Sequence, residues 1–296
     1  NGRKQWISLR GWDINAPVLL FLAGGPGGTQ MAAVRHELAE LEKHFVVVNW
    51  DQPGSGKSYY AEKIEAITPQ TYIEDGYALT AYLKERFGQE KIYLMGESWG
   101  SALGIFLVNK YPESYHAFIG TGQMVDFVET ERLDYAKALE IAQAQGDTDL
   151  IKRLEANGEP PYYGKDVTWK SAVYLNYLSA YMANNPDIDN SGYNTLRDIC
   201  SSEYGLLDKI NFFRGIVNTF NHVYQQLYSM DLRTDYPKLE VPVFFFLGRH
   251  DVNAPIQLAE EYAKVLEAPD KGIIWFERSG HSPWINEGDK FVREVL

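Results

Sequence analysis

The sequence has few of the features that would tie the chain to a disulfide scaffold, a membrane or nucleic acid. Its 296 residues include one cysteine, Cys200, so no disulfide can form within the chain. No apolar run reaches the roughly 18 residues that a membrane-spanning helix needs. Basic residues are outnumbered, with 28 Lys and Arg against 40 Asp and Glu, and the net charge is −12. So acidic a chain is a poor partner for nucleic acid or an anionic membrane.

Two further absences concern metals and location. No His, Cys and carboxylate side chains cluster at the spacing of a metal site, so we expect no metal. No signal peptide is visible, which slightly favours the cytoplasm. The chain begins with Asn1 rather than Met, however, which leaves open a longer precursor with a targeting or anchoring segment. The oligomeric state is also left open.

Short apolar runs alternate with helical patterns in the first and last parts of the chain. Runs typical of buried parallel strands lie at residues 18–23, 45–50, 92–95, 116–121, 241–247 and 272–276. A short strand is expected at residues 5–9, and helices at residues 31–44, 71–87, 102–111, 255–266 and 288–296. This alternation predicts an α/β fold with a mostly parallel, doubly wound sheet.

The pattern changes between residues 125 and 238, where only helices are expected. Amphipathic stretches lie there at residues 129–145, 169–184 and 206–228. Because the sheet pattern resumes at residue 241, we interpret this segment as a helical cap inserted into the sheet domain rather than as a separate domain. The predicted division is a core of residues 1–124 and 239–296 and a cap of residues 125–238.

One pentapeptide has the form of a nucleophile elbow. Gly-Glu-Ser-Trp-Gly at residues 96–100 fits G-x-S-x-G, with an apolar strand before it and a helical pattern after it. A nucleophile at such a turn sits in a strained backbone conformation, so its neighbours along the turn must be small. Ser98 is therefore the predicted nucleophile.

A serine nucleophile needs a base, and the base needs an orienting acid. Asp251 and His281 each follow a predicted strand, in the chain order Ser, acid, His that this fold expects. Asp126, after the strand at residues 116–121, is the competing acid. With an unperturbed histidine as base, activity should rise with pH near about 6.5.

Two glycine-rich loops follow the first two buried strands. Gly-Gly-Pro-Gly at residues 24–27 can bring backbone N–H groups close to a developing oxyanion, and we expect the N–H groups of Gly25 and Trp99 to form that hole. Residues 53–58 end like a phosphate-binding loop, but Asp51 stands where the pattern needs glycine. Nucleotide binding is therefore disfavoured.

These motifs resemble the α/β-hydrolase superfamily and, within it, the proline iminopeptidase (prolyl aminopeptidase) family of serine peptidases. The resemblance rests on residues 24–27, 51–58, 96–101, 248–251 and 280–282. It implies Ser98 as nucleophile, Asp251 as acid, His281 as base, and Gly25 with Trp99 as oxyanion donors. It also implies no cofactor. The sequence departs from the family at Ala23, where His is usual, and at Pro53, where Arg is common.

The resemblance also implies a preference for a free N-terminal proline or another small N-terminal residue, with a small peptide as substrate. An enzyme that releases such a residue must hold an ammonium group, which a partly buried carboxylate would do. Glu203 in the cap is the predicted partner. The alternatives are an esterase or other small acyl hydrolase with the same triad, and a non-catalytic ligand-binding protein of the same fold.

Overall fold

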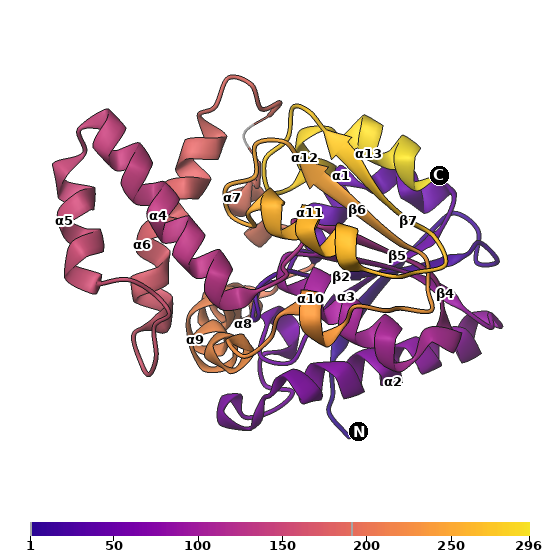
Figure 1. Ribbon diagram of the computed structural model, residues 1–296. Helices are drawn as coiled ribbons and strands as arrows, with labels where there is room; N and C mark the ends of the chain where they lie inside the picture. Colours follow the sequence, from indigo (N-terminus) through magenta and orange to yellow (C-terminus); the bar gives the residue numbers. More distant parts are fainter. Residues whose placement is uncertain (1, 191) are drawn as a thin grey trace.

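The computed structural model describes residues 2–190 and 192–296, and its core is one seven-stranded sheet (Figure 1). The strand order is β1-β3-β2-β4-β5-β6-β7, with β1 antiparallel to β3 and every other pairing parallel. The strands are β1 (Trp6–Arg10), β2 (Val18–Leu22), β3 (Val46–Asp51), β4 (Ile92–Glu97), β5 (Tyr115–Thr121), β6 (Val243–Gly248) and β7 (Lys271–Phe276). Each lies within two residues of its predicted range, and the mostly parallel α/β sheet is confirmed.

Helices cover both faces of this sheet, because successive strand residues point to opposite sides. Leu20 and Leu22 of β2 pack with helices α2 (Pro69–Phe87), α3 (Trp99–Lys110) and α11 (Ile256–Val265). Their neighbours Leu19 and Phe21 pack with α1 (Met31–Glu37), α12 (Pro283–Asn286) and α13 (Gly288–Val295). All five residues of β2 are buried, as a strand covered on both faces requires.

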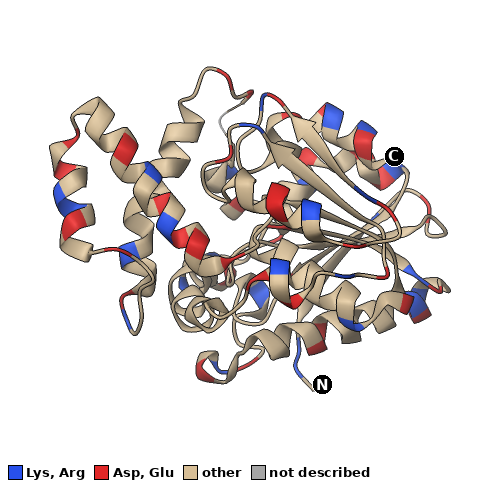
Figure 2. Ribbon diagram, viewed as in Figure 1, with Lys and Arg blue, Asp and Glu red and all other residues tan. Residues whose placement is uncertain are grey.

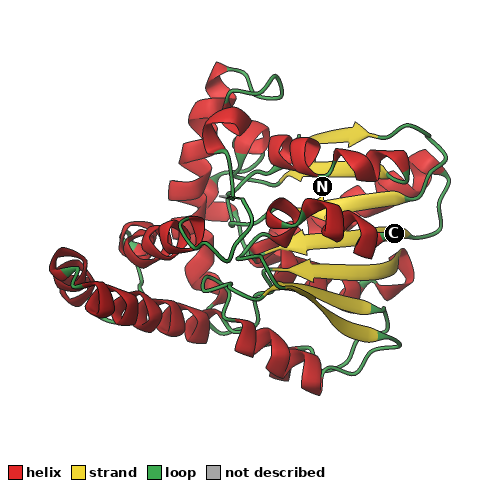
Figure 3. Ribbon diagram, turned by 90° about the horizontal axis from the view of Figure 1, so that it is seen from above, coloured by secondary structure: helices red, strands yellow, loops and turns green. Residues whose placement is uncertain are grey.

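The segment between β5 and β6 is helical throughout its named elements. It holds α4 (Phe127–Gln145), α5 (Thr148–Asn157), α6 (Val167–Ala183), α7 (Thr195–Ile199), α8 (Leu206–Arg214), the π-helical turn η5 (Gly215–Thr219), α9 (Phe220–Val223), the 3₁₀ turn η6 (Tyr224–Leu227) and α10 (Leu232–Asp235). Figure 3 shows α4, α5 and α6 standing away from the sheet, beyond one end of its strands. The exact division of the chain at residues 125 and 238 stays a prediction.

One predicted helix is interrupted. The pattern at residues 31–44 predicts a single helix, but α1 ends at Glu37 and a 3₁₀ helix, Ala39–Lys43, follows. The chain tightens here because the Leu41 N–H bonds the Leu38 carbonyl, three residues back. Both leucines are thereby buried against the sheet, at 1% and 0% exposure. Helix α5 was not predicted; it buries only Leu150 and Leu154.

Charged side chains lie mainly on the outer helices and loops, whereas the strands are largely free of them (Figure 2). Within the described ranges, no helix is both long and apolar enough to cross a bilayer.

Candidate active site

Ser98 occupies the sharp turn between β4 and α3, with φ 54° and ψ −123°. Asn190 is the other non-glycine residue with positive φ in the described part of the chain. Backbone crowding explains the flanking glycines: a Cβ on Gly96 would lie 2.2 Å from the Gly100 carbonyl oxygen, and one on Gly100 would lie 2.1 Å from the Leu22 carbonyl oxygen. Only glycine fits at either position, so the motif holds its serine in a strained conformation.

His281 and Asp251 follow β7 and β6 and meet side by side. The Nδ1 atom of His281 lies 2.9 Å from Oδ2 of Asp251. The other carboxylate oxygen, Oδ1, accepts the backbone N–H groups of Asn253 at 2.8 Å and Ala254 at 3.0 Å. Asp251 is therefore fixed by its own loop, with one oxygen turned to the imidazole.

The surroundings of His281 change its protonation. Burial acts to lower the pKa of the imidazole, but the charge and hydrogen bond of Asp251 and the charge of Glu97 together outweigh it and raise the pKa of His281 to about 9. This raised pKa favours the protonated imidazole in the free protein. This departs from the value of about 6.5 expected for an unperturbed histidine.

The turn at the end of β5 contacts both Ser98 and His281. The Ser98 N–H donates to the Thr121 carbonyl oxygen at 3.0 Å. The next residue, Gly122, lies so close to the imidazole that a Cβ there would be 2.6 Å from Cε1 of His281. The structure thus brings Ser98, Asp251 and His281 to the same edge of the sheet, where the parallel strands end.

The loop of residues 24–28 lies beside the serine. A Cβ on Gly24 would be 3.3 Å from the Ser98 Cβ, and Gly25 has φ 135°. Trp99 is the first residue of α3, where a backbone N–H has no acceptor within its own helix. Trp99 therefore follows Ser98 directly along the chain, and Gly25 directly follows the residue that lies beside the Ser98 Cβ. Their role stays a prediction.

Two glutamines support this loop at the position where Ala23 replaces the family's usual histidine. Gln30 accepts the Gly24 N–H at 3.0 Å, and Gln52 donates to the Ala23 carbonyl oxygen at 3.0 Å. Gln52 also accepts the Trp99 indole N–H at 2.9 Å. The loop is therefore held from both sides by side-chain amides.

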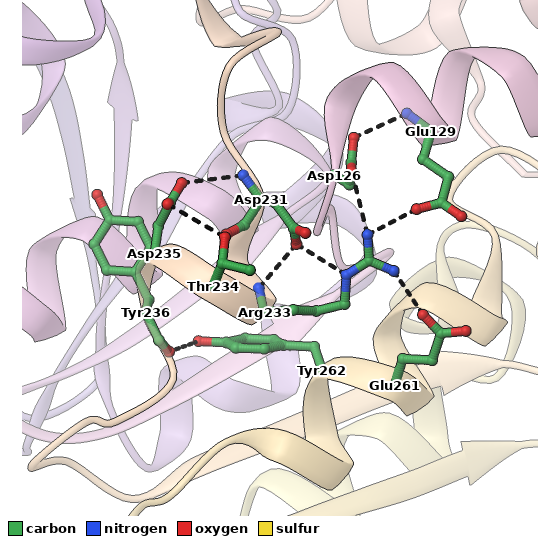
Figure 4. Close-up of polar contacts among 9 residues, drawn as sticks. All are labelled: Asp126, Glu129, Asp231, Arg233, Thr234, Asp235, Tyr236, Glu261 and Tyr262. Atoms are coloured by element: carbon green, nitrogen blue, oxygen red, sulfur yellow. Dashed lines mark hydrogen bonds and ion pairs between the residues drawn. The ribbon is translucent and has the colours of Figure 1, made fainter.

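Asp126, the competing acid, is engaged elsewhere (Figure 4). It caps α4 by accepting the Glu129 N–H at 2.9 Å, and its second oxygen lies 3.2 Å from Nη2 of Arg233. Arg233 also pairs with Glu129, Asp231 and Glu261. Asp126 thus belongs to an ion-pair cluster that ties α4 to α10 and α11.

Glu203, and Asp51 ahead of the loop that resembles a phosphate-binding loop, both have partners within the chain. Glu203 forms an ion pair with Arg35 of α1. Burial acts to raise the pKa of Glu203, but hydrogen bonds and the Arg35 charge outweigh it and lower that pKa. Asp51 is fully buried and accepts the Lys57 N–H at 2.8 Å, and a Cβ on Gly56 would be 2.3 Å from its Oδ2. The Asp51 carboxylate therefore fills the place that a bound phosphate would need.

A cavity of about 480 Å³ borders His281. It is lined by His281 and Ser282, which follow β7, and by residues of the segment between β5 and β6 such as Met182, Ile188 and Tyr193. No Asp or Glu is among its described lining residues. In the ranges that the structure describes, no group of three or more His, Cys, Asp or Glu is arranged to hold a metal ion.

Three buried carboxylates near the site were missed from sequence. Glu97 was treated only as the variable residue of G-x-S-x-G, and Glu131 and Asp134 only as part of a helical pattern. They are 1%, 0% and 1% exposed. A signal existed for both on the buried face of α4: Glu131 lies four residues from the apolar positions Phe127 and Tyr135, and Asp134 lies four residues before Ala138.

The fold and these motifs have a counterpart among known proteins. The sequence model of the family described as alpha/beta hydrolase fold matches residues 17–283. The chain therefore belongs to the alpha/beta hydrolase family, and it is a hydrolase of that family.

Two relatives of the chain have names that describe a peptidase. The chain is 32% identical to the Bacillus subtilis (strain 168) protein named "Probable aminopeptidase YbaC", over 99% of this chain and 92% of that protein. It is 26% identical to a "Proline iminopeptidase" of Saccharolobus solfataricus, over 94% of this chain and 83% of that one. A crystal structure of proline iminopeptidase from Mycobacterium smegmatis superposes with TM-score 0.66 at 18% identity, covering 99% and 93% of the two chains. That structure supports the fold alone.

Proposed function

We propose that this hydrolase uses Ser98 as nucleophile, His281 as general base and Asp251 as the acid that orients the base. The observation that carries the proposal is the 2.9 Å contact between Nδ1 of His281 and Oδ2 of Asp251, beside the strained turn of Ser98. A carboxylate at Nδ1 favours the tautomer whose Nε2 can accept the serine proton.

The reaction would proceed through an acyl-enzyme. The Ser98 Oγ attacks the substrate carbonyl carbon, while Nε2 of His281 takes the hydroxyl proton. The N–H groups of Gly25 and Trp99 donate to the oxyanion that forms. His281 then gives the proton to the leaving group as the bond to it breaks. Water attacks the acyl-enzyme by the same route and restores Ser98.

For the substrate, we propose a peptide whose N-terminal proline or small residue is released, so that the enzyme is an aminopeptidase. The names of the two relatives support this choice. An esterase or other small acyl hydrolase with the same three residues is the alternative. A non-catalytic binding protein of the same fold is a further one. A proline arylamide and a short acyl ester separate the first two, and a fluorophosphonate probe, which needs an activated serine, separates both from the third.

The test of the nucleophile is Ser98→Ala. Turnover of the better substrate should fall by about 10³-fold or more, and fluorophosphonate labelling should disappear. Thermal stability should hardly change, because alanine keeps the same Cβ in the strained turn. Wild-type turnover in Ser98→Ala would remove the serine from the mechanism.

An aminopeptidase must also hold the substrate's ammonium group. Glu203 remains our sequence-based prediction, but its carboxylate already pairs with Arg35. Glu131 and Asp134 on α4 offer another partner. Within the described chain, Oε1 of Glu131 and both carboxylate oxygens of Asp134 are buried without a hydrogen-bond partner. Asp134 is also close enough to Asp251 for the two charges to interact. A buried carboxylate without a partner is costly, and an ammonium would remove that cost.

Glu203→Gln, Glu131→Gln and Asp134→Asn are therefore compared on a proline arylamide and on an uncharged ester. The variant that removes the ammonium partner should lose about ten- to a hundred-fold on the arylamide alone, equivalent to about 1.5–3 kcal/mol. Glu140→Gln, at an exposed position of α4, is the matched control. Equal losses on both substrates would exclude a residue from ammonium binding. Cleavage of N-acetylated substrates at the free-amine rate would contradict the aminopeptidase interpretation and leave the esterase.

A further inference from the structure

Glu97, the residue before Ser98, is a buried carboxylate in the middle of the candidate site. It ends β4 and is only 1% exposed. An ionised carboxylate is expensive to bury unless hydrogen bonds replace its water. The partners of Glu97 therefore indicate why a charged residue stands at a position that packing alone would fill with an apolar one.

Four donors surround this carboxylate. The Ser282 hydroxyl donates to Oε1 at 2.6 Å and the Trp284 indole N–H donates to the same oxygen at 2.8 Å. The Gln30 amide and the Tyr193 hydroxyl both donate to Oε2. Since a carboxylate has about four acceptor sites, Glu97 is fully satisfied as an anion. It has no capacity left for a substrate ammonium.

These donors come from three separate segments around Ser98. Ser282 is adjacent to His281, and Trp284 lies in α12 just beyond it. Gln30 accepts the Gly24 N–H at 3.0 Å, so its contact continues into the loop of residues 24–28. Tyr193 belongs to the cap and lines the cavity beside His281. One carboxylate thus links the loop of His281, the loop of residues 24–28 and the cap to the end of β4, directly before Ser98.

We propose that Glu97 is a positioning residue that holds the loop of His281 and the loop of residues 24–28 in place beside Ser98. Its contact with Tyr193 connects this arrangement to the cap. This inference rests on the proposed function. Its negative charge also favours the protonated imidazole of His281, because it contributes to the raised pKa of that group. Glu97 therefore acts through other residues and touches no reacting atom.

The test is Glu97→Gln, which keeps the size of the side chain and removes its charge. The readout is the rate of fluorophosphonate labelling as a function of pH, since it needs no knowledge of the substrate. We expect labelling to slow by about ten- to a hundred-fold at its optimal pH. We also expect the pH at which labelling is half-maximal to move down, because His281 loses a neighbouring negative charge. A change in folding alone would not shift this midpoint.

Glu42→Gln is the matched control, since Glu42 is also a buried glutamate, 8% exposed, but pairs with Arg10 away from the site. It should label at the wild-type rate and midpoint. Tyr193→Phe and Ser282→Ala each remove one donor and should slow labelling by a few-fold. If Glu97→Gln does not fold, these two variants test the inference in its place.

The results separate this inference from the proposed function. If the wild type labels at Ser98 and Glu97→Gln labels at the same rate with the same midpoint, the positioning role is wrong while the nucleophile stands. If Glu97→Gln does not fold, Tyr193→Phe and Ser282→Ala are tested in its place. Labelling of both variants at the wild-type rate and midpoint would then show that the positioning role is wrong. If the wild type does not label at all, the proposed function itself fails.

Discussion

The imidazole of His281 lies against Gly122, in the turn whose preceding residue accepts the Ser98 N–H. Ser98 and His281, the proposed nucleophile and base, are therefore positioned by the same two residues at the end of β5, although they lie far apart in the sequence. Asp251 contacts the same imidazole at Nδ1. The relative placement of the three side chains thus depends on the backbone ends of β4, β5, β6 and β7.

A first prediction separates the two candidate acids. Asp251→Asn should preserve the fold and lower turnover by about 10⁴-fold, because the amide favours the wrong imidazole tautomer. Asp126→Asn should stay within a few-fold of wild type, since asparagine still caps α4 and only the contact to Arg233 weakens. Steady-state rates of the two purified variants show which aspartate is the acid. The reverse outcome would place the acid after β5.

A second prediction concerns the pH dependence of activity. The base must be neutral, and the pKa of His281 is raised to about 9 in the free protein. We expect kcat/KM to rise from pH 7 to above pH 9 rather than to level off above about 6.5. Asp251→Asn, measured at high enzyme concentration, should move this rise to lower pH. A plateau already reached at pH 7 would contradict the raised pKa.

A third prediction concerns stability and Glu131. Burial raises the pKa of this carboxyl to about 7, although the hydroxyl groups of Tyr174 and Ser171 donate to it. A group with a raised folded-state pKa contributes stability that is present below its unfolded pKa, about 4.3, and is lost as pH rises through 7. Glu131→Gln should therefore lose less stability than wild type between pH 5 and pH 8.

Chemical denaturation at several pH values measures this difference. Glu140→Gln, the exposed control on the same helix, should follow the wild-type curve. Parallel curves for Glu131→Gln and wild type would show that folding does not raise the pKa of Glu131.

The sequence-based predictions were most accurate for the strands of the sheet. Ser98, Asp251 and His281 could be expected at one edge of the sheet because an apolar run precedes each of them and a parallel sheet brings its strand ends together, whereas their catalytic roles stay a prediction. The helices α5 and α7 could not be placed, because α7 has only five residues and α5 buries only two side chains. Short or weakly buried helices depend on tertiary contacts rather than on a local pattern.

Partners of buried charges were also beyond prediction. Glu203 pairs with Arg35, which is 168 residues away along the chain. Tyr193 reaches Glu97 across 96 residues. Neither contact leaves a periodicity or a motif in the sequence, because each depends on how the helical segment between β5 and β6 packs against the rest of the chain. The raised pKa of His281 was not predicted either, since it follows from the packing of Asp251 and Glu97 around the imidazole.

The last prediction tests whether the turn of Gly122 positions the base. Gly122→Ala would place a Cβ 2.6 Å from Cε1 of His281, so the imidazole must move. Gly88→Ala is the matched control, because Gly88 has a similar φ, 62° against 50°, and nothing within 4 Å of the added Cβ. Each substitution should cost about 1–2 kcal/mol in backbone strain. Only Gly122→Ala should also lower kcat, by about 10²-fold, because an ångström-scale displacement of a catalytic group has an effect of that size. Stability by thermal melting and kcat are measured on both variants. Equal kcat values in the two would show that His281 does not need the position it holds against Gly122, and would weaken its assignment as the base.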